Sequence, residues 1–189
     1  MSTTVSPETK LLRTLNRIQY CLPNGYSLIR ELQQGMNNFR NTLTAFNKIV
    51  ANKEAGTPGI DNETIDGINL KKLEKYHLEY FNNDYHPKPV KRIFIPKDNK
   101  KTRSLVLQTI KNWLIQKCLE QLLTPYFEKI FSEWSFGFRT KKSCNDAIKR
   151  VKQRFKGIDY IVKIDLKGYF DIINHEFLMR TLKQFIRKK

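Results

Sequence analysis

The sequence predicts an α+β fold in which helices surround one short β-hairpin and are followed by a strand, a turn and a final helix. Three observations support this prediction. Apolar residues recur at helical spacing over most of the chain, two short alternating runs flank a turn in its middle, and a β-branched run near its end leads into a carboxylate and a glycine. Hydrophobic residues make up 40% of the 189 residues, which argues for a folded core and against a disordered tail.

Residues 1–50 are predicted to form a helical N-terminal extension. Ser6, which a proline follows, can cap the first helix. A second helical pattern comes next, and Gly35 can divide it into two helices with Asn37 or Asn38 as the cap of the second. The first helix is expected to bury an apolar stripe that consists of Leu11, Leu12, Leu15, Ile18 and Leu22.

The next segment, residues 51–156, opens with a loop that is rich in turn-forming residues. Asn69 can cap a helix over Leu70–Phe81. Val90–Pro96 and Thr102–Leu107 then predict the two strands of a β-hairpin. The cations of this hairpin suit contacts with phosphates. The alternative, which is equally open, is a solvated hairpin whose charges keep the strand edges from aggregating. These cations are Arg92, Lys97, Lys100, Lys101 and Arg103.

A helical pattern from Ile110 to Pro125 is expected to face the core with its apolar stripe. The run Ser135–Ser143 follows and is here called the glycine box. Gly137 lies there between aromatic residues, which lets the backbone approach a ligand, and Arg139 is one of several cations that can neutralise phosphates. A helix over Asn145–Phe155 is expected next, and its inward residues would be Ala147, Ile148 and Val151.

Tyr160–Ile164 is predicted to be a strand that ends at Asp165, and Asn174 can cap the helix after the turn. A carboxylate at the end of a strand can hold a metal ion, so Asp165 is the candidate metal ligand. A structural role as a helix or turn partner is the alternative for this residue. That structural role is the one we assign to Asp171.

The formal net charge of +17 is the strongest signal in the composition. From residue 86 to residue 156, 18 Lys and Arg stand against 5 Asp and Glu, so 13 of the 17 excess positive charges lie in this stretch. Such a concentration favours a polyanion as partner, and nucleic acid is the expected one. A membrane is disfavoured because no run of about 18 apolar residues could span a bilayer. Three scattered cysteines predict a reducing compartment and no structural zinc.

Asp165–Phe170, together with Asp171, Ile173 and His175, resembles the first catalytic motif of reverse transcriptases, and most closely that of the group II intron reverse transcriptase/maturase family. Three earlier segments resemble the same family in the same order. They are the loop with Gly59-Ile60-Asp61 and Thr64-Ile65-Asp66-Gly67, the basic hairpin, and the glycine box.

The resemblance implies that residues 51–156 are polymerase fingers and that residues 157–189 begin a right-hand polymerase palm. Asp165 would then bind the catalytic Mg²⁺. Phe170 would lie under the sugar of the incoming nucleotide and reject a 2′-hydroxyl. The parent reaction would be RNA-directed DNA synthesis on an RNA template, with maturase help in the splicing of an intron RNA.

The resemblance also implies roles for cations of the fingers. Positions equivalent to Arg92, Lys97 and Arg103 face the template and the incoming triphosphate in this family. Two departures weaken the match of the nucleotide pocket. Asn112-Trp113 stands where the family usually has Asp-Lys or Asp-Arg, and Arg103 is followed by Ser-Leu-Val-Leu-Gln instead of Pro-Leu-Gly-Ile-Pro.

The 189 residues contain no Asp-Asp pair, whereas the family carries its other catalytic aspartates in a Tyr-Ala-Asp-Asp box. We therefore expect weak Mg²⁺ binding and no polymerase activity from this chain alone, as in a truncated or split enzyme that a second chain completes. The alternatives are a non-enzymatic RNA-binding splicing helper and a decayed reading frame.

Abundant Lys, Asn and Ile suggest an AT-rich genome, so a mitochondrion or plastid is the expected compartment, with a bacterial cytoplasm as the alternative.

Overall fold

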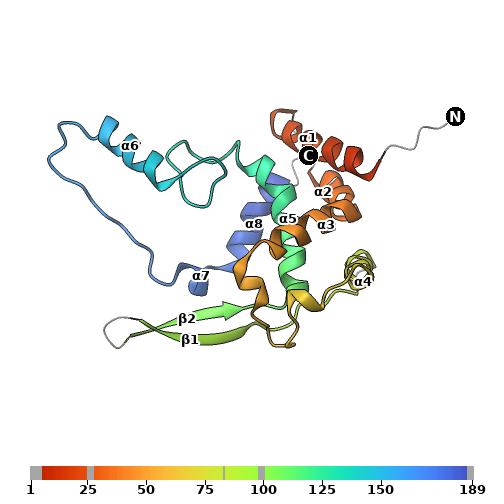
Figure 1. The fold of residues 1–189 in the computed structure, drawn as a ribbon. Coiled ribbons are helices and arrows are strands. Elements are labelled where there is room, and N and C mark those ends of the chain that lie inside the picture. Colours follow the sequence, from red (N-terminus) through yellow and green to blue (C-terminus); the bar gives the residue numbers. More distant parts are fainter. Residues whose placement is uncertain (1–5, 25–27, 83, 98–100, 187–189) are drawn as a thin grey trace.

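The structure is a computed structural model that describes residues 6–24, 28–82, 84–97 and 101–186. It combines helices with one two-stranded sheet, in agreement with the mixed fold class predicted (Figure 1). The α-helices are α1 (Pro7–Asn24), α2 (Ile29–Met36), α3 (Phe39–Val50), α4 (Leu70–Phe81), α5 (Ile110–Phe127), α6 (Cys144–Arg154), α7 (Tyr169–Ile172) and α8 (His175–Ile186). Two 3₁₀ turns, η1 (Lys53–Gly56) and η2 (Ile65–Gly67), lie between α3 and α4.

A helical core forms where α1, α2 and α3 pack against α5. The side chains of Leu114, Cys118 and Leu122 lie on the inner face of α5 and are almost fully buried. Burial raises the pKa of the Cys118 thiol to about 11, so it remains protonated at neutral pH. The helix continues through Pro125, two residues beyond its expected end, and its last turn buries Tyr126 in the core.

The predicted helix breaks are confirmed, and the caps explain them. Asn38 accepts a hydrogen bond from the Arg40 amide at 3.0 Å and begins α3, and Asn69 accepts from the Lys72 amide at 2.9 Å and begins α4. Gly35 has a packing role as well, because a Cβ there would lie 2.5 Å from a methyl carbon of the Leu122 side chain. The absence of a side chain therefore lets α2 approach α5 closely.

The predicted apolar stripe of α1 is partly wrong. Leu11 and Ile18 are buried and Leu15 packs against the core, but Leu12 is 61% exposed. Thr14 is buried in its place and satisfies its hydroxyl by donating to the Lys10 carbonyl at 3.0 Å. The side chain of Leu22, the last member of the stripe, lies outside the described residues.

The predicted hairpin is present as β1 (Lys91–Lys97) and β2 (Lys101–Leu107), paired antiparallel with Ile93 opposite Leu105. It projects from the helical core as a two-stranded arm (Figure 1). The tip at residues 98–100 lies outside the described residues, as do the side chains of Lys97 and Lys101.

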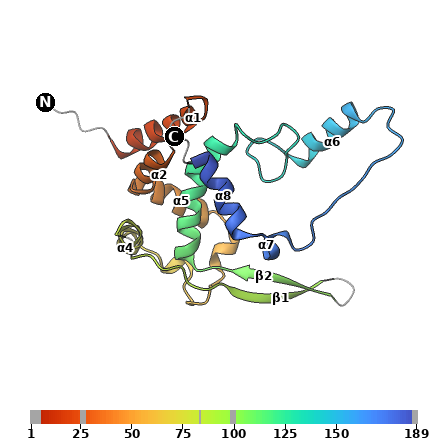
Figure 2. The same ribbon diagram turned by 180° about the vertical axis from the view of Figure 1, so that it is seen from behind.

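The helix after the glycine box is present as α6, but its inward face is not. Ile148 and Val151 are 48% and 43% exposed, and no residue of α6 is buried. No described element covers that face, because α6 stands away from the helical core in both views (Figures 1 and 2). Its start is fixed by a capping box between Ser143 and Asp146.

The predicted strand at Tyr160–Ile164 is not formed. Residues 158–166 run as a chain without regular structure from α6 toward α7 (Figure 2), and their apolar side chains are exposed. A strand needs a neighbour to share its backbone hydrogen bonds, and none of the described residues lies beside this segment as a strand. Gly168 then takes a left-handed conformation with φ +63° and starts α7.

Helix α8 returns the chain to the helical core. Asn174 caps it, as predicted, by accepting from the Phe177 amide at 2.9 Å. At its far end the Tyr126 hydroxyl donates to the Phe185 carbonyl at 2.7 Å, so the C-terminal ends of α5 and α8 are in contact. None of the helices in the described part of the chain is long and apolar enough to cross a membrane.

Candidate functional site

The candidate site is a groove of about 1040 Å³ where β2 meets the turn around Asp165. Thr102 and Arg103 line it from the hairpin. The other wall is the segment from Ile164 to Asp171, which includes Asp165 and Phe170. The fold thus brings residues about 60 positions apart in sequence to one surface. Three of them, Arg103, Asp165 and Phe170, are candidate site residues of the sequence analysis.

Asp165 lies on the exposed part of this groove and not in apolar packing. Its backbone has no regular structure, and the left-handed turn at Gly168 brings the next segment round beside it. The Phe170 ring is 87% exposed and its edge meets the Tyr169 ring, with centroids 5.3 Å apart. An accessible carboxylate and an accessible flat ring are therefore both open to a ligand.

Arg92 contributes positive charge at the edge of the groove. Its Nη2 atom lies 4.0 Å from Oδ1 of Asp171, and both side chains are more than half exposed. An exposed pair at this distance is weak, so it leaves the guanidinium available to phosphates. Lys97 ends β1, and the prediction that its side chain contacts nucleic acid falls outside the described residues.

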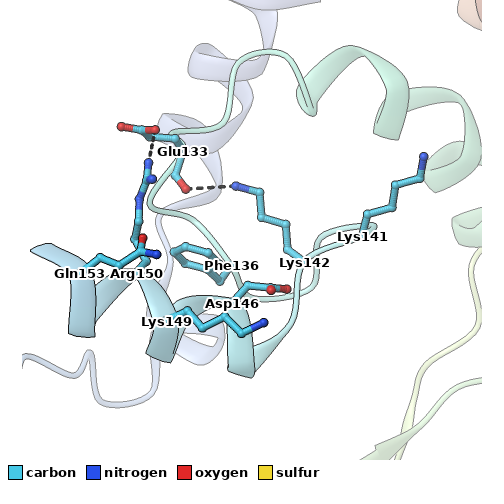
Figure 3. Close-up of a pocket in the computed structure, with 8 residues that line it drawn as sticks. All are labelled: Glu133, Phe136, Lys141, Lys142, Asp146, Lys149, Arg150 and Gln153. Carbon is cyan, nitrogen blue, oxygen red and sulfur yellow. Dashed lines mark hydrogen bonds and ion pairs between the residues drawn. The ribbon is translucent and has the colours of Figure 1, made fainter.

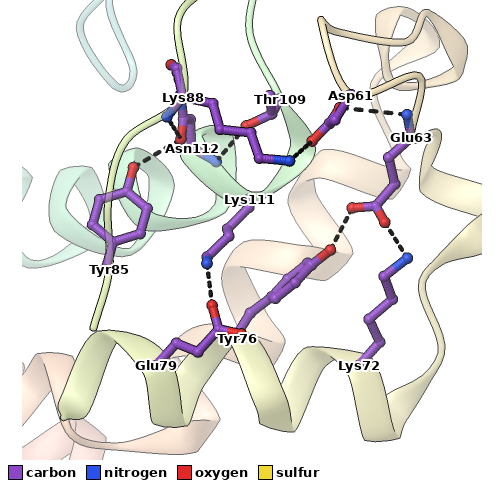
Figure 4. Close-up of polar contacts among 10 residues, drawn as sticks. All are labelled: Asp61, Glu63, Lys72, Tyr76, Glu79, Tyr85, Lys88, Thr109, Lys111 and Asn112. Carbon is purple, nitrogen blue, oxygen red and sulfur yellow. Dashed lines mark hydrogen bonds and ion pairs between the residues drawn. The ribbon is translucent and has the colours of Figure 1, made fainter. Parts of the chain in front are cut away.

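The base of the hairpin is held by Asn112 on α5, which sequence reasoning noted only as a departure from a family pattern. Its amide group donates to the Lys88 carbonyl at 2.8 Å and its oxygen accepts from the Tyr85 hydroxyl at 2.9 Å (Figure 4). The Lys88 backbone amide donates to the same oxygen at 3.3 Å. A buried asparagine therefore fixes the segment that leads into β1.

The loop before α4 is tied to the same segment. Asp61 forms an ion pair with Lys88 at 3.4 Å (Figure 4). A Cβ added at Gly59 would lie 2.8 Å from the Gln108 carbonyl oxygen, so the loop backbone packs directly against the chain between β2 and α5. Gly59 and Asp61 thus help to position the hairpin.

Further polar contacts hold α4 against this region. Glu63 accepts from the Tyr76 hydroxyl and pairs with Lys72, and Lys111 on α5 pairs with Glu79 (Figure 4). Burial and the contact with Glu63 raise the pKa of Tyr76, so its hydroxyl remains a donor at neutral pH. The sequence held no local signal for these contacts, because their partners come from separate elements.

Arg139 of the glycine box is directed into the protein. Its side chain is only 8% exposed and forms an ion pair with Glu128 at 2.8 Å. The guanidinium also donates to the Ser132 carbonyl at 2.8 Å and to the Ser135 carbonyl at 3.1 Å. Hydrogen bonding to Arg139 holds the pKa of Glu128 below its usual value. Arg139 therefore folds the chain between α5 and α6 and lies outside the groove of Asp165.

Metal-binding capacity in the described part of the chain is limited. No group of three or more His, Cys, Asp or Glu side chains there could enclose an ion. Asp165 and Asp171 both line the groove, but Asp171 is the residue beside Arg92. The oxygen ligands fit a hard cation such as Mg²⁺, which commonly takes one or two carboxylates and completes its shell with phosphates and water.

Known proteins show similarity over most of this chain. Residues 95–189 match the family profile described as "Reverse transcriptase (RNA-dependent DNA polymerase)". The chain is 38% identical over 144 residues to "Group II intron-encoded protein LtrA" of Lactococcus lactis subsp. cremoris, a match that covers 76% of this chain and 24% of the relative.

Two fungal proteins are similar as well. The "Putative COX1/OXI3 intron 1 protein" of Saccharomyces cerevisiae is 32% identical over 154 residues, covering 82% of this chain and 18% of the relative. The "Uncharacterized 91 kDa protein in cob intron" of Schizosaccharomyces pombe is 30% identical over 145 residues, covering 77% and 18%. The matches thus span about a quarter or less of these relatives.

Proposed function

The chain belongs to the reverse transcriptase (RNA-dependent DNA polymerase) family, and we propose that it supplies the nucleic-acid-binding fingers and the first palm carboxylate of a group II intron-type reverse transcriptase and maturase. One observation carries the proposal. The groove gathers Arg103 of the hairpin with Asp165 and Phe170, the acid and the aromatic ring of the catalytic motif. The substrate would be an intron RNA or another RNA template.

The groove residues have distinct parts in this proposal. Arg92 and Arg103 bind phosphates of the template or of an incoming triphosphate, and Lys97 is assigned the same role from the family resemblance alone. The exposed ring of Phe170 lies against the sugar and excludes a 2′-hydroxyl by contact. Arg139 acts as a positioning residue that holds the glycine box in shape.

Asp165 would provide a carboxylate oxygen to Mg²⁺ in the same groove. When bound there, the metal would neutralise developing charge on the reacting phosphate. Weak affinity is expected for the 189 residues alone, because phosphates would have to provide much of the coordination shell. The remaining carboxylates would come from further palm sequence, in the same polypeptide or in a second chain.

A role in RNA binding without polymerisation is the second candidate. The observation that favours it is that positive charge extends well beyond the groove, onto α6 and the glycine box.

For the compartment, we propose a mitochondrion or plastid, or a bacterial cytoplasm. Relatives include a bacterial protein and a plant protein named "Nuclear intron maturase 2, mitochondrial", of Arabidopsis thaliana.

A salt titration of RNA affinity tests the proposed groove. We expect the affinity of the wild-type chain for a single-stranded intron segment to fall linearly with the logarithm of salt concentration. Replacement of two groove cations in the variant R92Q/R103Q should reduce that slope by about 1.4, since each single-strand phosphate contact contributes about 0.7. The control K48Q/K71Q removes the same charge from exposed sites on α3 and α4. Equal slopes for the two variants would contradict a phosphate-binding role for the groove.

A further inference from the structure

The chain from Phe131 to Arg154, here called the basic arm, forms a second unit apart from the groove of Asp165. It contains the glycine box and α6, and it extends from the end of α5 on the same side as the hairpin (Figures 1 and 2). Cation–π contacts stabilise it internally. Arg150 lies over the Trp134 ring at 5.0 Å and Lys142 lies over the Phe136 ring at 4.9 Å.

A pocket of about 400 Å³ opens between the glycine box and α6 (Figure 3). Four cations and two carboxylates line it, which leaves a local excess of two positive charges. They are Lys141, Lys142, Lys149, Arg150, Glu133 and Asp146.

Both carboxylates of the pocket are occupied within the arm. Glu133 pairs with Arg150, and Asp146 accepts from the Ser143 hydroxyl at 2.6 Å and from the Ser143 amide at 3.0 Å. Among the described residues, neither Lys141 nor Lys149 has a carboxylate within 4.0 Å. Both ammonium groups therefore lack a close ion pair and can contact an external anion, although the charge of Lys149, after the hydrogen bonds from Ser143, also helps to lower the pKa of Asp146.

Phe138 lies three residues before Lys141 and presents its ring to solvent. The side chain is fully exposed, and the backbone is left-handed with φ +56°, a conformation that a bulky residue rarely adopts. The neighbouring Arg139, with its internal contacts to Glu128 and Ser132, fixes the chain at this point. No burial among the described residues compensates for the strained backbone, so the ring is held outward as a free planar surface.

We propose that the basic arm binds single-stranded RNA, with a base stacked on Phe138 and with Lys141 and Lys149 each contacting a phosphate of the same strand (Figure 3). Proteins that bind single strands without sequence preference combine exposed aromatic rings, on which bases stack, with cations that contact the backbone phosphates. Three residues span at most about 11 Å, so the ring and the pocket can contact neighbouring nucleotides of one strand. The inference rests on the proposed function only in taking RNA as the ligand, and it assigns a site distinct from the groove.

Fluorescence anisotropy with a labelled oligouridylate of about 12 nucleotides tests this site in the full chain. Phe138→Ala should weaken binding by about 5- to 150-fold, the range of one lost stacking contact, without changing the salt slope. Phe81→Ala, which removes an exposed ring from α4, should have no such effect. The variant K141Q/K149Q should reduce the salt slope by about 1.4, and duplex RNA should not respond to Phe138→Ala because its bases are already stacked.

The outcomes separate this site from the proposed function. Wild-type binding with a steep salt slope that Phe138→Ala leaves unchanged would overturn the stacking site alone. No binding of single-stranded RNA by the wild-type chain at low salt would overturn both proposals. Concentration-dependent self-association that Phe138→Ala abolishes, seen by size-exclusion chromatography, would show that the ring contacts protein and would also overturn the stacking site.

Discussion

Arg139 shows that a cation in a motif that is expected to bind nucleic acid can instead form contacts within the protein. Composition and motif both placed it among phosphate-binding residues, whereas the structure buries it against Glu128, 11 residues earlier in the chain. That partnership depends on how the chain turns after α5, and no local pattern reveals it. By contrast, Arg92 and Arg103 lie on the hairpin that the sequence predicts, whereas Asp165 lies in a segment without regular structure and not at the end of the predicted strand.

The ion pair of Glu128 and Arg139 predicts that the free energy of unfolding decreases at acidic pH. The pKa of Glu128 is lowered in the folded state. The ion pair therefore contributes its full stability at pH values above 4.5, the ordinary pKa of the carboxyl, and this contribution is lost as the pH falls through the lowered pKa. Glu128→Gln should therefore reduce stability at neutral pH and flatten its pH dependence below 4.5. Urea unfolding at several pH values measures both effects. Glu74→Gln, on an exposed face of α4, is the matched control, and equal pH profiles for the two variants would disprove the role of the pair.

Gly59 is the residue whose substitution should most directly disturb the base of the hairpin. An alanine Cβ there would lie 2.8 Å from the Gln108 carbonyl oxygen, a backbone atom that cannot move aside on its own. Gly59→Ala should lower the free energy of unfolding by about 1–3 kcal/mol, as overpacking does. Chemical denaturation measures this, with Gly56→Ala as control because nothing lies within 4 Å of a Cβ at that position. The packing account fails if both variants are as stable as the wild type.

At the scale of elements, prediction succeeded where a signal is local and failed where it depends on a neighbour. The caps at Asn38, Asn69 and Asn174 are short-range hydrogen bonds, and the structure confirms all three. The run Tyr160–Ile164 has the residues of a strand, but a strand also requires an adjacent strand to share hydrogen bonds. Helix α6 likewise has an amphipathic pattern but no described element against its apolar face.

Hydrogen exchange should distinguish these elements. Amides of residues 158–166 have no regular backbone pairing and are expected to exchange at rates close to those of an unfolded chain. Amides on the buried face of α5, around Leu114, Cys118 and Leu122, should be the most protected. Mass spectrometry of peptides from the two regions makes the comparison within one sample. Strong protection of residues 158–166 in the isolated chain would contradict the extended, unpaired segment.

At the scale of the whole molecule, α5 organises the positions of both projecting arms. Asn112 near its start fixes the approach to the hairpin, and Glu128 just after its end holds Arg139 and the basic arm. Helix α8 then returns the chain to α5 through the Tyr126 hydroxyl. The folded chain also shows where charge gathers. The pocket of the basic arm has four cations and two carboxylates, whereas Arg103 lines the groove together with Asp165 and Asp171.

This arrangement predicts nucleic-acid binding without nucleotide transfer by the 189 residues alone. Two-metal catalysis needs more carboxylates than Asp165 and Asp171 provide, and the sequence contains no Asp-Asp pair. We expect the purified chain to bind a primed RNA template and to incorporate no labelled deoxynucleotide. Primer extension with Mg²⁺ measures this, and template-dependent incorporation above that of Asp165→Asn would refute it.

The most direct test of the central claim asks whether bound RNA lies beside Asp165. Fe²⁺ in place of Mg²⁺, with peroxide and a reductant, generates hydroxyl radicals that cleave RNA next to a bound ion. The account predicts one localised cleavage site in an RNA bound to the wild-type chain. Asp165→Asn should abolish it, whereas Asp159→Asn, which removes an exposed carboxylate six residues earlier, should leave it in place. Diffuse or absent cleavage of bound RNA, or an identical pattern with Asp165→Asn, would contradict a nucleic-acid groove built around this aspartate.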